Sequence, residues 1–130
     1  MKNSVAYPQV PPRRKGLTRV WFAFGNSWCG MRIALMEPAF RMEVAFSAIL
    51  LPAAFWLGQS ALERAILAGA VLLVLVVEVL NTAIEAAIDR VGSEYHELSK
   101  AAKDLGSAAV LLVIGMCCAI WLTILVSRVI

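Results

Sequence analysis

Between Asp104 and Arg128 the chain reads LGSAAVLLVIGMCCAIWLTILVS, and this run over residues 105–127 contains no charged side chain. A helix needs about 20 mostly apolar residues to cross the hydrocarbon core of a bilayer, so the run is long enough to span it. It also lacks the alternation of polar and apolar residues that marks the strands of a membrane β-barrel. The run therefore predicts a transmembrane helix, which we expect over residues 98–128.

Two further apolar stretches lie upstream. Residues 44–62 and residues 65–77 carry no charge, and apolar character continues to about residue 88. They predict spans over about residues 40–58 and 61–90, joined by the turn Gly58-Gln59-Ser60. Ser60 and Glu63 have the spacing of a capping box that opens the second of these helices. We expect Glu63 and Arg64 to form an ion pair at the membrane surface without a chemical role.

The composition excludes several classes of protein. Of 130 residues, 61% are hydrophobic and 16% are charged, which is too apolar for a soluble domain or a disordered chain. The three cysteines have neither metal-ligand spacing nor the number needed for a disulfide framework. We expect an integral membrane protein with no nucleic-acid partner.

The amino-terminal region is basic. Residues 1–36 contain six basic residues and no acidic one, so the positive-inside rule places them in the cytoplasm, together with the loop over residues 89–104. Residues 14–36 mix basic and aromatic side chains, which predicts an amphipathic helix on the inner membrane surface. Residues 1–15 are expected to form a disordered basic tail, and residues 16–130 a single membrane-embedded domain.

The second span carries a stripe of polar side chains. On a helix that turns about 100° per residue, Glu78, Asn81, Thr82, Glu85 and Asp89 lie on one face. Asn81 and Thr82 could serve only to hydrogen-bond neighbouring helices. Three acids with few nearby cations suggest instead a missing partner, most simply a divalent metal ion.

Other polar residues allow two interpretations. Glu37 and Glu43 flank Arg41 at the start of the first span, and Arg41 could simply pair with one of them, Glu43 included. His96 is the only histidine; a loop histidine is more often solvated than catalytic, but together with Tyr95 it could line a nucleotide. Gly92 is expected to end the second span and Ser93 to cap the third.

One long segment is specific to a known family. The runs EVLNTAIEAAIDRVGSEYHELS (78–99) and AKDLGSAAVL (102–111) resemble the prokaryotic diacylglycerol kinase family. The upstream runs GLTR (16–19), SW (27–28), GMR (30–32) and EPAFRME (37–43) are also similar to that family. The form of the loop resembles the Gram-negative lipid kinases rather than the undecaprenol kinases of Gram-positive bacteria.

The resemblance implies an all-α membrane protein with an amino-terminal surface helix and three transmembrane helices, assembled as a homotrimer in the bacterial inner membrane. It implies an enzyme that transfers the γ-phosphate of MgATP to the hydroxyl of diacylglycerol and yields phosphatidate. Magnesium is the implied cofactor, and ATP, diacylglycerol and membrane lipid are the implied partners.

The resemblance also implies roles for individual residues. Glu78 is the expected general base, Glu37 and Glu85 the metal ligands, and Asn81, Glu43 and Asp89 supporting residues. Contacts with ATP are expected from Arg19, Glu37, Glu85, Glu94, Tyr95, His96, Lys103 and Asp104. Contacts with the lipid substrate are expected from Arg19, Trp28, Arg32, Glu78 and Ser107.

Three alternatives compete with this interpretation. The nearest is a kinase for another lipid alcohol, such as undecaprenol. A small multidrug transporter has similar length but uses four spans and one central acid, whereas three spans and clustered acids are predicted here. In a purely structural protein the polar stripe would only mediate assembly.

Overall fold

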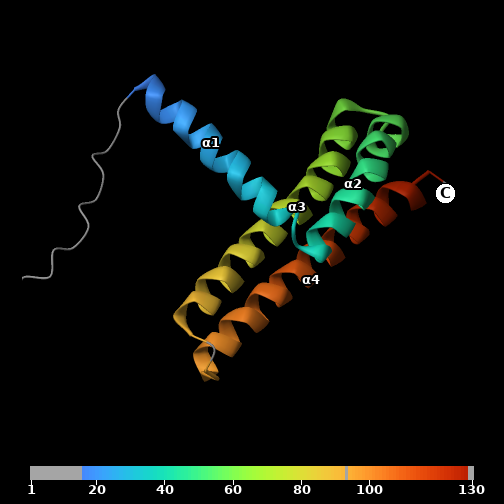
Figure 1. Cartoon of the computed structure of the whole chain (residues 1–130). Helices are drawn as coiled ribbons and strands as arrows, with labels where there is room; N and C mark the ends of the chain where they lie inside the picture. Colours follow the sequence, from blue (N-terminus) through green and yellow to red (C-terminus); the bar gives the residue numbers. More distant parts are fainter. Residues whose placement is uncertain (1–15, 93, 129–130) are drawn as a thin grey trace, which may run out of the picture. The chain divides into compact units, whose positions relative to one another are not determined.

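The computed structural model describes residues 16–92 and 94–128, and all regular secondary structure in these ranges is α-helical (Figure 1). Its helices are α1 (Leu17–Ala34), α2 (Pro38–Leu57), α3 (Ala61–Val91) and α4 (Glu97–Val126). The predicted fold class, an amino-terminal helix followed by three long apolar helices, is confirmed. The tail predicted over residues 1–15 lies outside the described residues.

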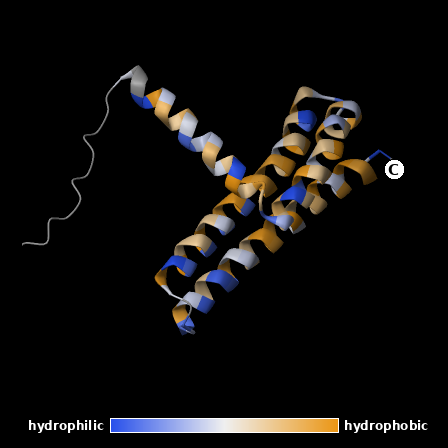
Figure 2. Ribbon diagram, in the orientation of Figure 1, coloured by the Kyte–Doolittle hydropathy of each residue, from blue (hydrophilic) through white to orange (hydrophobic). Residues whose placement is uncertain are grey.

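Three of the helices are long and apolar enough to cross a membrane: α2, α3 and α4. Figure 2 shows their middle sections as predominantly hydrophobic, with hydrophilic residues gathered toward the joined ends of α3 and α4. Large apolar side chains remain on the outer surface, among them Phe46 (62% exposed) and Leu112 (74% exposed). An apolar surface of this extent requires a lipid environment or a partner protein, because water would penalise it.

The core of the spanning helices is small and lies around α3, which packs against both α2 and α4. Ala54 from α2, Leu67 and Ala70 from α3, and Trp121 from α4 are almost completely buried there. Small residues such as Ala54 and Ala70 allow helix backbones to approach closely, which is how helices associate in lipid.

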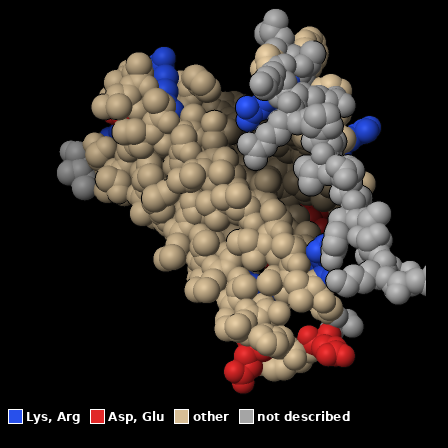
Figure 3. Space-filling model, turned by 90° about the vertical axis from the view of Figure 1, so that its left-hand side faces the viewer, with Lys and Arg blue, Asp and Glu red and all other residues tan. Residues whose placement is uncertain are grey.

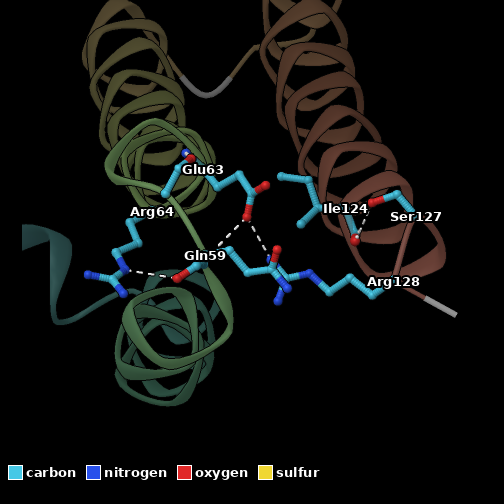
Figure 4. Close-up of polar contacts among 8 residues, drawn as sticks. Gln59, Glu63, Arg64, Ile124, Ser127 and Arg128 are labelled. Carbon is cyan, nitrogen blue, oxygen red and sulfur yellow. Dashed lines mark hydrogen bonds and ion pairs between the residues drawn. The ribbon is translucent and has the colours of Figure 1, made fainter.

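The turn between α2 and α3 is held by side-chain contacts (Figure 4). Ser60 caps α3 by accepting a hydrogen bond from the Glu63 backbone N–H, as the capping box predicts, while the Glu63 carboxylate accepts from the Gln59 N–H. The predicted Glu63–Arg64 ion pair is wrong. Glu63 pairs with Arg128 at 2.6 Å, and the Arg64 Nε donates to the Gly58 carbonyl at 2.9 Å. Adjacent helical residues point about 100° apart, so Arg64 turns back toward the turn while Glu63 faces α4.

The connection between α3 and α4 differs from the expected one. Gly92 follows the last residue of α3, as predicted. Ser93 lies outside the described residues, and the residue that caps α4 is His96, whose Nδ1 accepts a hydrogen bond from the Leu98 N–H. A histidine with a free ring nitrogen can satisfy an unpaired N–H at a helix start in the same way as a serine hydroxyl.

The chain divides into two compact units, Met1–Arg32 and Ile33–Ile130. Most of α1 belongs to the first unit, and all three spanning helices belong to the second. Within α1, three aromatic side chains are largely exposed: Trp21 (79%), Phe24 (70%) and Trp28 (67%). Exposed aromatic side chains beside Arg19 and Arg32 are what a surface helix in contact with lipid headgroups requires.

Candidate functional site

A polar pocket of about 280 Å³ lies where the start of α2 meets α3 and α4. We call it the carboxylate pocket, because Glu37, Glu78 and Glu85 all line it. The complete lining consists of Glu37, Ala39, Glu78, Asn81, Thr82, Glu85, Ser107 and Val110. Five of the residues predicted for the site, from three separate helices or their ends, therefore meet in one place: Glu37, Glu78, Asn81, Glu85 and Ser107.

Glu37 is presented to this pocket by the start of α2. It is the residue immediately before the helix, in an extended conformation, and Pro38 occupies the first helical position. Proline fits there because it has no N–H to leave unpaired. Both backbone hydrogen-bonding groups of Glu37 are paired: its N–H donates to the Ala34 carbonyl, and its carbonyl accepts from the Arg41 N–H. Its side chain makes no capping hydrogen bond, so the carboxylate is free to face the pocket.

Glu78 is the most buried acid in the described chain, with 5% of its surface exposed. Among residues 16–92 and 94–128 its carboxylate has neither a hydrogen-bond donor nor an ion-pair partner. A buried carboxylate without partners costs several kcal/mol in a membrane helix, so such a residue usually marks a functional site.

Asn81 and Glu85 are linked along α3. The Asn81 Nδ2 donates to the Glu85 Oε1 at 3.2 Å, one helical turn away. The Asn81 Oδ1 lies against Gly106 of α4, where any β-carbon would collide with it. This oxygen is buried and has no hydrogen-bond partner within the described residues. Gly106 was not singled out by the sequence, because nothing in the chain marks which residue of α4 faces Asn81.

Two ion pairs lie beyond the carboxylate pocket, where the polar stripe of α3 continues toward α4. Asp89 of α3 pairs with Lys103 of α4, and Asp104 pairs with Lys100 one turn earlier on α4. All four side chains are at least 40% exposed. Exposed pairs of this kind contribute little to stability, so a ligand of higher charge can displace them.

The predicted loop residues line a second pocket of about 650 Å³ at the α3–α4 connection. Glu94, Tyr95 and His96 line it together with Ile88 and Ser99. His96 is thus both the cap of α4 and a pocket residue. We call this the loop pocket. In Figure 3, acidic side chains gather at that end of the molecule, below a broad surface without charged residues.

A third pocket, of about 540 Å³, is almost wholly apolar and extends from Glu78 along α2. It shares Ala39, Glu78 and Val110 with the carboxylate pocket, so the two are continuous. We call it the apolar pocket. Its remaining lining comes from Met42, Glu43, Phe46, Ser47, Leu50, Val71, Val74, Ile114, Cys117 and Cys118.

Glu43 is a second acid at the edge of the apolar pocket. Its Oε2 is buried and has no hydrogen-bond partner in the described part of the chain. The alternative pairing of Glu43 with Arg41 is not found there either. Glu43 therefore resembles Glu78 in that its carboxylate faces a pocket rather than a partner.

Arg19, Trp28 and Arg32 lie on α1 in the other compact unit, where each is exposed. Their predicted contacts with ATP and lipid remain predictions.

Residues 25–125 match the family model described as prokaryotic diacylglycerol kinase. The chain belongs to the prokaryotic diacylglycerol kinase family. A protein named diacylglycerol kinase from Escherichia coli (strain K12) is 49% identical over 87% of this chain and 93% of its own length. Proteins of the same name from Pseudomonas aeruginosa and Haemophilus influenzae are 46% and 40% identical, over 86% and 82% of this chain and 92% and 91% of their own lengths.

Membership of the prokaryotic diacylglycerol kinase family and three apolar helices together identify a multi-pass membrane enzyme. A kinase family suggests phosphoryl transfer from a nucleotide, and transfer of this kind typically uses a divalent ion. Within the described ranges no group of three or more His, Cys, Asp and Glu side chains is arranged to hold a metal ion alone. Magnesium typically binds one or two protein carboxylates and completes its shell with phosphate oxygens and water. Glu37 and Glu85, in a pocket lined by no Lys, Arg or His, suit that mode of binding.

Proposed function

We propose that this chain is an ATP-dependent diacylglycerol kinase that uses Mg²⁺, with residues 16–130 as its catalytic domain. The observation that carries the proposal is the position of Glu78, which lines both the carboxylate pocket and the apolar pocket. A kinase for a lipid alcohol must bring together a water-soluble nucleotide and an apolar acceptor. One pocket suits each of them, and Glu78 is the charged residue common to both.

The length of α2 supports a site at the membrane boundary. Its 20 residues span roughly 30 Å, which matches the hydrocarbon core of a bilayer. The carboxylate pocket lies at the first turn of α2, and so at the edge of that core, whereas the apolar pocket runs along α2 into it. A diglyceride would fit this arrangement, with its hydroxyl at the headgroup level near the carboxylate pocket and its acyl chains along the apolar pocket.

In the proposed reaction the lipid hydroxyl oxygen attacks the γ-phosphorus of ATP. A bond forms between that oxygen and phosphorus, the bond between the γ-phosphorus and the bridging oxygen breaks, and ADP leaves. Glu78 accepts the hydroxyl proton, a role for which a desolvated carboxylate is well suited. Glu37 and Glu85 would hold Mg²⁺, which would supply positive charge to offset that of the phosphates when bound. The Asn81 amide fixes the orientation of Glu85 through its hydrogen bond.

The nucleotide would extend from the loop pocket to the carboxylate pocket. Ser99, Lys103 and Ser107 follow one another at four-residue spacing on α4, so they lie along one face between the two pockets. Lys103 would exchange Asp89 for a phosphate group. Glu94, Tyr95 and His96 would contact the nucleoside, Asp104 would assist, and Arg19, Trp28 and Arg32 of α1 would border the substrates.

The proposal includes a location and an assembly. The basic charge of the amino-terminal region supports a cytoplasmic position for that region and for the α3–α4 connection, at the bacterial inner membrane, where ATP is available. A three-helix subunit leaves the carboxylate pocket open on one side, which supports a homotrimer in which a neighbouring subunit closes it.

The test is ADP release by the purified protein in detergent–lipid micelles, with and without Mg²⁺, and with diacylglycerol, undecaprenol or no added lipid alcohol. The proposal expects turnover only when diacylglycerol and Mg²⁺ are both present. Turnover with undecaprenol instead of diacylglycerol would retain the kinase and change its substrate. No turnover of either lipid by folded protein would overturn the proposal.

A further inference from the structure

Ser47 is a buried hydroxyl in the apolar pocket that the reaction described above does not use. It lies on α2 one turn beyond Glu43, is 6% exposed, and lines the pocket with Glu43 and Glu78. Its hydroxyl makes no hydrogen bond in the part of the chain that the structure describes. The residue is buried, but its hydroxyl oxygen keeps some exposure, so it can bond to a ligand in the pocket that it lines.

Two hydroxyls at the carboxyl-terminal end of α4 show how such a group is satisfied by its own backbone. The Thr123 Oγ1 donates to the Ala119 carbonyl at 2.8 Å, and the Ser127 Oγ donates to the Ile124 carbonyl at 2.8 Å. Bonding to a carbonyl of the preceding turn is the usual way for Ser and Thr to be satisfied in a membrane helix. The Ser47 hydroxyl makes no such bond in the described chain, so it can donate a hydrogen bond to a ligand in the apolar pocket.

Ser47 lies farther along the apolar pocket than the two carboxylates, which would face the reacting hydroxyl of the lipid. The apolar pocket contacts α2 from Ala39 to Leu50, a length of roughly 16 Å at 1.5 Å per residue. Its two carboxylates lie toward one end, and Ser47 is about one turn, roughly 6 Å, farther along α2 than Glu43. Beyond Ser47 the lining is apolar or thiol, from Leu50, Val71 and Cys117.

The chemistry of diacylglycerol matches this order of groups. Its free hydroxyl can donate a proton to a carboxylate, whereas its ester carbonyls, a few bonds farther along, can only accept hydrogen bonds. Ionised Glu43 and Glu78 are acceptors and cannot pair with a carbonyl, and the thiols of the pocket are weak donors. Ser47 is the one hydroxyl donor among the lining residues of the apolar pocket.

We propose that the Ser47 hydroxyl donates a hydrogen bond to an ester carbonyl of the bound diacylglycerol, and that Ser47 thereby selects ester-linked glycerides over lipid alcohols that lack the carbonyl. The inference rests on the proposed kinase activity and adds a specificity-determining residue to it. Ser47 takes no part in the transfer of the phosphoryl group.

The experiment compares two acceptors of matched chain length: a diacylglycerol and the corresponding dialkylglycerol ether, which keeps the hydroxyl and lacks the carbonyl. The ratio of kcat/KM for ester to ether is measured for the wild type and for Ser47→Ala, Ser47→Thr and Thr123→Val. One neutral hydrogen bond is worth roughly three- to tenfold in this ratio. We expect the wild type to favour the ester by that factor, Ser47→Ala to lose the preference, and Ser47→Thr to keep it.

Thr123→Val is the matched control, because it removes a hydroxyl from a spanning helix outside the three pockets and should leave the ratio unchanged. An equal loss of activity on both acceptors in Ser47→Ala would show a packing role and overturn the inference, as would an unchanged ratio. In both cases activity of the wild type on diacylglycerol would leave the kinase itself intact. A wild type inactive on both acceptors would overturn the kinase and this inference together.

Discussion

The beginning and the middle of α3 carry similar polar residues, which are paired at the beginning and unpaired in the middle. At the Ala61 end, the Glu63 carboxylate binds both the Gln59 N–H and Arg128, and the Arg64 guanidinium binds the Gly58 carbonyl (Figure 4). Around the carboxylate pocket, Glu78 has no partner in the described chain. The Asn81 Oδ1 is likewise unpartnered there.

This difference separates structural polar groups from functional ones. A charged group satisfied by its own protein stabilises the fold and has little capacity left for a ligand. A buried group without a partner costs free energy in the folded protein, and a ligand that supplies the missing partner recovers it. Mutations in the two regions should therefore affect different quantities: stability at the Ala61 end and turnover at the carboxylate pocket.

The largest effect is expected from Glu78→Gln, which keeps the size of the side chain and removes its capacity to accept a proton. We expect kcat for lipid-dependent ADP release to fall by about 10²- to 10⁴-fold, the usual contribution of a general base. Circular dichroism should show unchanged helix content. The matched control is Glu63→Gln, the acid in the first turn of α3, which should retain most of the activity. Comparable losses in both variants would remove the distinction between the two regions.

A smaller effect is expected from Lys103→Met. Loss of a charge-assisted contact with phosphate should raise KM for ATP by roughly ten- to hundredfold, with a smaller change in KM for the lipid. Lys100→Met is its control, because Lys100 is likewise an α4 lysine paired with an aspartate, Asp104, and is not a proposed phosphate contact. If both variants raise KM for ATP equally, Lys103 acts through the general positive charge of the region and not through a specific contact.

Gly106→Ala tests the contact that positions Asn81. The added β-carbon would collide with the Asn81 Oδ1, so α3 and α4 must move apart or Asn81 must rotate away from Glu85. Forcing a methyl group into a packed contact costs about 1–3 kcal/mol, and detergent-unfolding titrations should show a loss of that size. Gly115→Ala, on the same helix with open space around it, should be neutral. Wild-type stability in Gly106→Ala would show that α3 and α4 are less closely packed than described.

The smallest effect is expected from Arg128→Ala, which removes the ion pair with Glu63. The two side chains are 23% and 36% exposed, and a pair of that exposure contributes about 1 kcal/mol or less. The same unfolding titration should detect this loss, while turnover at saturating substrate stays close to that of the wild type. A large loss of turnover with little change in stability would assign the Ala61 end a part in catalysis.

Much of this arrangement was predictable because it depends on one helix at a time. Apolar runs gave the three spans, and the helical period brought Glu78, Asn81 and Glu85 to one face of α3. Contacts between helices have no such period. Glu63 and Arg128 are 65 residues apart in the chain, so the nearer Arg64 was the natural but wrong choice of partner. For the same reason the sequence did not indicate that Gly106 faces Asn81, or that Ser47 shares a pocket with Glu78.

The unequal lengths of the spanning helices have a consequence for how the protein responds to its membrane. With 31 residues, α3 is roughly 46 Å long, whereas α2 is roughly 30 Å long. The first turn of α2 and the middle of α3 meet at the carboxylate pocket, and the remaining turns of α3 continue beyond it. A thicker bilayer would draw that junction below the lipid headgroups, and a thinner one would leave it in water. The acyl-chain length of the surrounding phospholipids would then set how readily nucleotide and lipid reach Glu78 together, and the hydrophobic thickness of the membrane would act as a control on the rate of the enzyme.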